Sequence, residues 1–138
     1  MRKGEDEISK LMKLRGQMDV GNVVRSIQDI VWRNVSVVRE GKSLCKTYNS
    51  LLRYREKVSA DLFIDEEHLI EALELRNMID IGLIIALAAL TRKETRGSHY
   101  RIDYPERNDK DWLKMIEIQR NRGAPQVNIR DPLMLINP

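Results

Sequence analysis

The chain has 138 residues, of which 42% are hydrophobic, 33% are charged and 5% are aromatic. This length fits a single domain with its own core, and the apolar content is too high for a disordered chain. The net charge of +3 arises from 24 basic and 21 acidic residues, a balance that argues against a dedicated nucleic-acid binder. The single cysteine, Cys45, excludes a disulfide framework within the chain and indicates a reducing compartment.

Residues 1–21 predict a short, weak N-terminal helix. Apolar side chains recur there at helical spacing, and Gly16 or Gly21 would end or bend the segment. The first ten residues, MRKGEDEISK, are too polar and acidic for a secretory signal peptide, so we expect none.

Residues 22–96 predict an all-α, up-down-up three-helix bundle of the spectrin-repeat kind. The first helix carries apolar residues at three- and four-residue steps from Val23 to Val38. Gly41 follows it and is suited to a left-handed C-terminal cap. Ser43 is the expected N-cap of the second helix, whose apolar positions continue to Leu62.

The third helix is expected from Asp65 to about Thr91, and its character changes along its length. Its first half is amphipathic, whereas its second half, IGLIIALAAL, is apolar nearly all round. A membrane span needs about 20 apolar residues, so this shorter run indicates a helix end that is covered on several sides.

Residues 97–138 are assigned to the same domain as an irregular loop and tail. The segment from Asp111 to about Asn121 could form one more short helix that packs through Trp112, Met115 and Ile116. The tail from Gly123 is rich in proline and aliphatic residues, so we expect an extended arm packed on the bundle or on a partner.

Metal binding, nucleophilic catalysis and nucleotide binding find little support in the residues. His68 and His99 are far apart in the sequence, which disfavours a zinc site. Cys45 begins an amphipathic helix and is expected to be a buried, inert thiol rather than a partner of His99. The glycines are scattered and form no phosphate-binding loop. We therefore expect no catalytic, cofactor-binding or metal-binding residue in this chain.

The segment TRKETRGSHYRIDYPERNDKDW, residues 91–112, combines alternating charges with turn-forming residues. Its arginines and tyrosines could follow a nucleic-acid backbone, but the acidic residues between them cancel the long-range field that such a binder needs. Gly97 permits a sharp reversal, and Pro105 restricts Tyr104 to extended or turn backbone. The pattern predicts a rigid loop, held by ion pairs within its own domain or presented to a neighbouring surface.

Residues 91–114 resemble a long motif, roughly RKESRGSHYREDYPERDDENWLKH, in flavoprotein subunits of succinate dehydrogenase and fumarate reductase. The stretches SIQDIVWRNVSVVREGKSL and ALELRNMIDIGLIIALAAL resemble helices that precede this motif, so the resemblance covers about residues 26–114. Thr95 and Met115 stand where the family has serine and histidine, and the tail from Ile116 matches nothing in it. L-aspartate oxidase is a related alternative, but its similarity fades after Pro105, which favours the succinate and fumarate enzymes.

The resemblance implies the C-terminal helical domain of an FAD-dependent oxidoreductase that interconverts succinate and fumarate. In that family the flavin- and dicarboxylate-binding residues precede this domain, so none is carried over and FAD is expected only in the full-length flavoprotein. The implied partners are its FAD-binding domain and an iron–sulfur subunit. A cytoplasmic location is expected, including the cytoplasmic face of a membrane complex. The expected docking residues are Arg92, Glu94, Arg96, His99, Arg101, Asp103, Tyr104 and Trp112.

A free-standing helical protein-interaction module is the competing interpretation. Such a module should pack its tail on its own bundle, whereas a domain of a larger protein should expose an apolar face where the rest of that protein sits.

Overall fold

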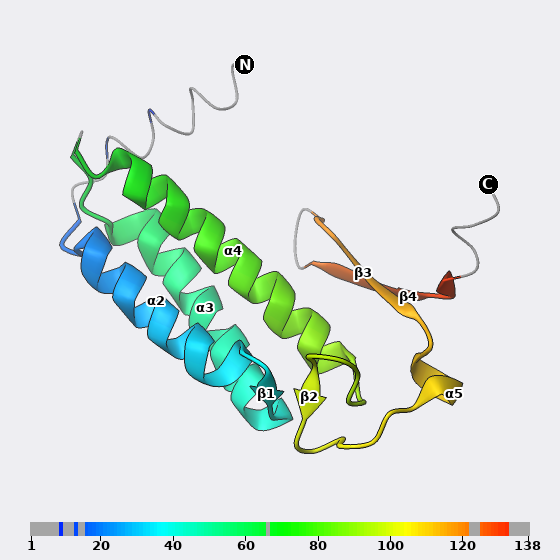
Figure 1. Cartoon of the computed structure of the whole chain (residues 1–138). Coiled ribbons are helices and arrows are strands. Elements are labelled where there is room, and N and C mark those ends of the chain that lie inside the picture. Colours follow the sequence, from blue (N-terminus) through cyan, green and yellow to red (C-terminus); the bar gives the residue numbers. More distant parts are fainter. Residues whose placement is uncertain (1–8, 10–12, 14–15, 66, 122–124, 133–138) are drawn as a thin grey trace.

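The computed structural model describes residues 9, 13, 16–65, 67–121 and 125–132. Within these residues, three long helices lie side by side (Figure 1): α2 spans Val20–Val35, α3 spans Gly41–Asp61 and α4 spans Leu69–Thr91. Successive helices run in opposite directions, which confirms the predicted up-down-up, all-α bundle. Most of the expected N-terminal helix lies outside the described residues.

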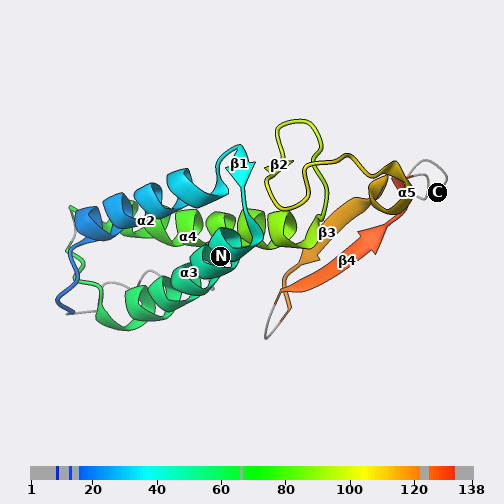
Figure 2. The same ribbon diagram turned by 90° about the horizontal axis from the view of Figure 1, so that it is seen from below.

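Short elements follow the bundle. Strand β2 (Tyr100–Arg101) pairs in parallel with β1 (Val38–Arg39), the segment between α2 and α3. The one-turn helix α5 (Asp109–Trp112) leads into an antiparallel hairpin of β3 (Met115–Gln119) and β4 (Gln126–Arg130). Figure 2 shows this hairpin to one side of the three helices, near the end of the bundle where α4 terminates.

The helix expected from Asp111 to about Asn121 is wrong beyond Trp112, because residues 115–119 form β3. In the hairpin register Ile116 lies opposite Ile129 and Ile118 lies opposite Val127, so one face of the hairpin is apolar. Two strands alone are marginally stable, and an apolar face beside a bundle favours this pairing over a short helix.

The predicted helix ends at Gly41 and Ser43 are also wrong. Helix α3 begins at Gly41 with Glu40 as N-cap, and Gly97 (φ 57°) is the described glycine with a positive φ. The backbone N–H of Gly41 donates to Asp103 Oδ2 at 3.2 Å, and a Cβ at this position would come within 2.8 Å of that oxygen. Glycine at this position allows the close approach of two segments and does not form a left-handed cap.

The start of α4 differs from the prediction by four residues. Asp65, the expected first residue, lies before the helix, where its Oδ1 accepts hydrogen bonds from both the backbone N–H and the ring Nδ1 of His68. His68 is the N-cap residue, and the helix begins at Leu69.

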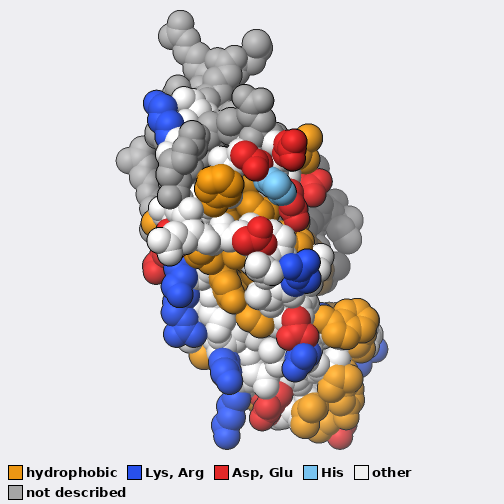
Figure 3. Space-filling view, turned by 90° about the vertical axis from the view of Figure 1, so that its left-hand side faces the viewer, with side chains coloured by type: hydrophobic (Ala, Val, Ile, Leu, Met, Phe, Trp, Pro, Cys, Tyr) orange, Lys and Arg blue, Asp and Glu red, His pale blue; other side chains and the backbone are white. Residues whose placement is uncertain are grey.

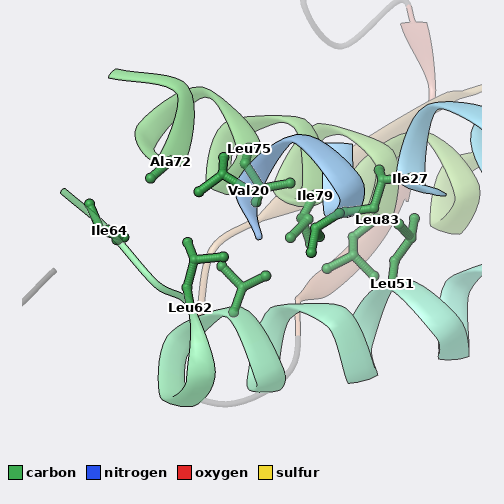
Figure 4. Close-up of a cluster of buried hydrophobic side chains, with 11 residues drawn as sticks. Val20, Ile27, Leu51, Leu62, Ile64, Ala72, Leu75, Ile79 and Leu83 are labelled. Carbon is green, nitrogen blue, oxygen red and sulfur yellow. The ribbon is translucent and has the colours of Figure 1, made fainter. Parts of the chain in front are cut away.

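The core lies between the three long helices and is almost entirely aliphatic. Figure 4 shows side chains from α2, α3 and α4 meeting in the bundle, among them Ile27, Leu51 and Ile79, which are fully buried. A smaller cluster of Val35, Leu44, Ala86 and Ala89 fills the end where the loop after α4 attaches. Among the described residues, none of the helices is both long and apolar enough to cross a bilayer.

Candidate functional site: the motif loop and the α2–α4 groove

The segment that resembled the family motif, residues 92–112, is named the motif loop here. It leaves the C-terminus of α4, reverses at Gly97, pairs with β1 and ends in α5. The positive φ of Gly97 confirms the predicted reversal, which is closed by paired backbone hydrogen bonds between Arg96 and His99 at 2.9 and 3.0 Å. The loop therefore has a defined backbone, and its side chains determine what it can contact.

Glu94 is the buried centre of the motif loop, with no exposed surface. Its carboxylate accepts from Arg92 Nη1 at 2.6 Å, from Arg96 Nε at 2.7 Å and Nη2 at 3.0 Å, and from the backbone N–H of Asn108 at 2.9 Å. Burial alone raises its pKa, but the hydrogen bonds from Arg96, Asn108 and Arg92 outweigh burial and hold the pKa at about 2. The carboxylate is ionised and joins both ends of the loop.

Arg101 is only 2% exposed and closes the C-terminus of α4. Its Nη1 donates to the carbonyl oxygens of Ala89 at 2.5 Å and Arg92 at 3.0 Å, while Nε and Nη2 donate to the two carboxylate oxygens of Asp103 at 2.8 and 2.7 Å. The last carbonyls of a helix lack partners within it and carry its negative dipole end, so a buried guanidinium suits this place. Its planar face also lies 5.0 Å from the ring centre of Tyr104.

His99 and Asp103 fasten the loop to the connection between α2 and α3. Arg39 Nη1 lies 2.7 Å from His99 Nδ1, and His99 Nε2 lies 3.3 Å from the carbonyl oxygen of Arg92. Arginine can only donate, so Nδ1 accepts and Nε2 carries the proton. Burial lowers the pKa of His99, which favours this neutral form. The Arg101 guanidinium likewise holds the pKa of Asp103 at about 2.

Arg92 connects the loop to the hairpin. Besides Glu94, its guanidinium donates to the carbonyl oxygens of Trp112 at 2.9 Å and Lys114 at 2.7 Å, and it lies 5.7 Å from the Trp112 ring centre. Arg96 also pairs with Asp109 at the start of α5. These contacts fix where the chain leaves the loop for β3.

All eight expected docking residues thus lie in one connected network within the chain. The buried groups, Glu94 and Arg101, have their polar atoms engaged by the loop and by α4. The charge pattern was compatible with ion pairs within the domain or with contacts to a neighbour, and the structure contains the ion pairs within the domain. Docking by these residues stays a prediction. At its surface the loop presents the apolar side chains of Tyr100, Ile102, Tyr104 and the adjoining Leu113 among exposed charged side chains such as Lys93, Glu106, Arg107 and Lys110.

A second candidate surface, which the sequence did not identify residue by residue, is the groove between α2 and α4. Trp32 is 76% exposed and Ile81 is 57% exposed, and with Ile85, Met78 and Val31 they line an apolar hollow. We name it the α2–α4 groove. Charged residues surround it: Arg25, Asp29, Arg39 and Glu74. Figure 3, which views the left-hand side of Figure 1, shows hydrophobic side chains at the bundle surface among charged ones.

The sequence feature that pointed to this groove is the run in the second half of α4 that is apolar nearly all round. That run predicted cover on several sides, and α2 and α3 supply it only in part, leaving Ile81, Ile84 and Ile85 exposed. Cys45, expected to be buried, is exposed on α3. In the described part of the chain, no three His, Cys, Asp or Glu side chains gather as a metal site would require.

The depressed carboxyl pKa values predict acid sensitivity. Glu94, Asp103 and Asp109 each have a pKa of about 2, against ordinary values of about 4.5 for Glu94 and 3.8 for the two aspartates. A lowered folded-state pKa contributes stability that is present above the unfolded value and lost as pH falls through the folded one. The melting temperature, followed by circular dichroism, should therefore fall between about pH 4.5 and 2. In a Glu94→Gln variant this fall should be smaller, and equal falls in both proteins would contradict the role of Glu94.

The match to a known protein family covers most of the chain. Residues 24–134 match the family model described as "Fumarate reductase flavoprotein C-term". The succinate dehydrogenase flavoprotein subunit of Rickettsia conorii is 41% identical over 85 residues, which covers 61% of this chain and 14% of that protein. The fumarate reductase flavoprotein subunit of Helicobacter pylori is 32% identical over 118 residues, which covers 82% of this chain and 16% of that protein.

Solved structures agree on the fold. A quinol–fumarate reductase structure with menaquinol superposes with a TM-score of 0.84 at 22% sequence identity, over 92% of this chain and 23% of the matched chain. The chain thus spans less than a quarter of the length of these relatives, and the rest of each of them has no counterpart in it.

Proposed function

The chain belongs to the C-terminal domain family of fumarate reductase and succinate dehydrogenase flavoproteins, and we propose that it docks on the FAD-binding part of such a protein through the α2–α4 groove. The observation that carries this proposal is the exposed apolar lining of the groove, with Trp32 and Ile81 mostly in solvent. Large apolar surfaces of this kind mark places that a partner covers. The part of its relatives that lies outside this chain supplies a partner of the required size.

The motif loop contributes rigidity to this arrangement rather than its main contact. Its internal ion pairs bind one another, the end of α4 and the α2–α3 connection, so the charged groups of this network are already engaged within the domain, whereas Lys93, Glu106 and Lys110 stay exposed. Its exposed Tyr100, Ile102 and Tyr104 offer a second apolar contact surface. Contact of the loop with an iron–sulfur subunit remains a prediction of the family resemblance.

FAD does not fit the residues of this chain. A dinucleotide needs a strand, a Gly-rich turn and a helix N-terminus, as part of a parallel sheet. Among the described residues the parallel pairing consists of β1 with β2, two residues each, and one isolated bridge between Met18 and Leu62. We therefore place FAD, and the interconversion of succinate and fumarate, in the rest of the flavoprotein, where this domain holds neighbouring parts in register.

The docking surface can be tested with two matched substitutions on α4 in the flavoprotein that carries this chain. Ile81→Glu introduces a charge into the groove, and burying it without a partner should lower the yield of flavin-containing protein roughly tenfold. Ile70→Glu makes the same change at a residue that is 71% exposed and outside the groove.

The measurement is the ratio of FAD absorbance to protein in the purified flavoprotein, together with its succinate-oxidising activity. Ile70→Glu should stay near the wild-type values. If Ile81→Glu matched Ile70→Glu in both quantities, the α2–α4 groove would not be the docking surface.

A further inference from the structure

A second hollow lies between the β3–β4 hairpin and the helices, on a different side of α4 from the groove. It is lined by α3, α4, the end of β3 and Pro125, and it encloses about 610 Å³. We name it the hairpin cleft. Its volume lies in the range of about 300–1,000 Å³ that is typical of small-molecule sites.

The inner walls of the cleft are apolar. The helices contribute the exposed Ile84 and, beneath it, the buried core residues Val58, Ile79 and Leu83, and the hairpin contributes Ile118. Ile118 belongs to the apolar face that Ile116, Val127 and Ile129 complete, and these hairpin side chains are half-buried or exposed. The apolar face of the hairpin is therefore only partly buried against the helices. A ligand with an aliphatic part would bury more of this apolar surface.

The charged lining of the cleft is mostly positive. Arg55 and Arg120 lie around it, against one carboxylate, that of Asp80, and Arg76, which also lines it, is engaged in an interaction of its own. Arg55 Nη1 is 4.0 Å from Asp80 Oδ1, and both side chains are about half exposed, so this pair neutralises little of the charge. The polar side chains of Ser59 and Gln119 also line the cleft. Guanidiniums bind carboxylates with planar, two-pronged hydrogen bonds.

We propose that the hairpin cleft binds an amphipathic organic anion, a medium-chain aliphatic carboxylate. Its chain lies between Ile118 of the hairpin and the exposed Ile84 of α4, and its carboxylate is held by Arg55 and Arg120. This site is separate from the α2–α4 groove, so its occupation does not depend on the docking of the flavin-binding part.

Three probes separate the two features of the site. Octanoate carries both a charge and a tail, 1-octanol carries the tail alone, and acetate carries the charge alone. Titrated into the isotope-labelled 138-residue chain, octanoate should shift the backbone amide signals of Ile118, Gln119 and Leu83. Octanoate should bind about tenfold more tightly than either other probe, since each of them lacks one of the two contributions.

Substitutions then locate the charge. Arg55→Gln and Arg120→Gln should each weaken octanoate binding by about fivefold, as expected for a charge-assisted contact at a partly exposed position. Arg33→Gln removes an equal charge from α2, where Arg33 pairs with Asp29 away from the cleft, and should leave binding unchanged. Equal binding of octanoate and octanol would overturn the proposal. So would shifts confined to Trp32 and Ile81, which would place the probe in the groove instead.

Discussion

Replacement of Glu94 by glutamine is expected to lower the free energy of unfolding by about 3 kcal/mol and the melting temperature by about 10 °C. The glutamine keeps the shape of the side chain but removes the charge that two guanidiniums and a backbone N–H share. Removal of one partner of a buried ion pair lowers the free energy of unfolding by about 3–5 kcal/mol, because the remaining charges are left without a partner. The lower end applies here because Arg92 and Arg96 retain 17% and 26% exposure and water can reach them.

The matched control is Glu106→Gln, which makes the same change at an exposed residue of the same loop. Its effect should stay within about 0.5 kcal/mol. Urea unfolding followed by circular dichroism measures both variants. Equal stability of the two would mean that the Glu94 network contributes little to folding.

Replacement of Arg101 by lysine is the second large expected effect, at about 2–3 kcal/mol. A single ammonium group cannot reach the Ala89 and Arg92 carbonyl oxygens and also bind both oxygens of Asp103, as the guanidinium does. The carbonyl oxygens at the end of α4 would then lose partners beside a side chain that is only 2% exposed, and the partly exposed Asp103 carboxylate would lose its two-pronged partner. The contact between Asp103 and the Gly41 N–H should weaken as well.

Amide hydrogen exchange provides a readout specific to this site. In Arg101→Lys, the amides of Tyr100 and Ile102, which donate to the carbonyl oxygens of Val37 and Arg39, should exchange faster. Arg107→Lys is the control, since Arg107 is exposed and pairs only with Asp109 among the contacts described for it. Identical exchange in the two variants would exclude Arg101 as the residue that holds β2 against β1.

The sequence predicted the bundle well because period and burial agree there. The apolar steps of the first two helices and the long run after residue 69 placed all three helices to within a few residues. The hairpin was missed because Met115 and Ile116, two residues of a five-residue strand, fit a helical face as readily as a strand. Its apolar face becomes evident only when β3 is aligned with β4.

The candidate site was predicted in part, for a different reason. A run of alternating charges shows that ion pairs will form, but it does not show whether the partner of each charge lies inside or outside the chain. Arg101 and Glu94 proved to be internal, a result that follows from the close approach of the loop to Gly41 and α4. The groove required the opposite inference: an apolar run such as IGLIIALAAL predicts that something covers it, and only the structure shows which side is left open.

The loop and the groove have complementary roles in the proposed function. The internal network fixes the end of α4 and the path of the loop, and α4 in turn presents Ile81 and Ile85 at the groove beside Trp32 of α2. A domain that is rigid by itself loses little conformational entropy when it docks on a neighbour. Different substitutions should therefore affect the two properties. Glu94→Gln should lower the stability of the domain, and Ile81→Glu should weaken its docking.

The measurement that tests this account most directly is the mass of the native polypeptide that carries this sequence, detected in an extract of its source cells. We predict a polypeptide several times larger than 16.1 kDa that co-migrates with flavin, as expected for a domain covering less than a quarter of its relatives. A native polypeptide of about 16.1 kDa, free of flavin and of any flavin-containing partner, would contradict it.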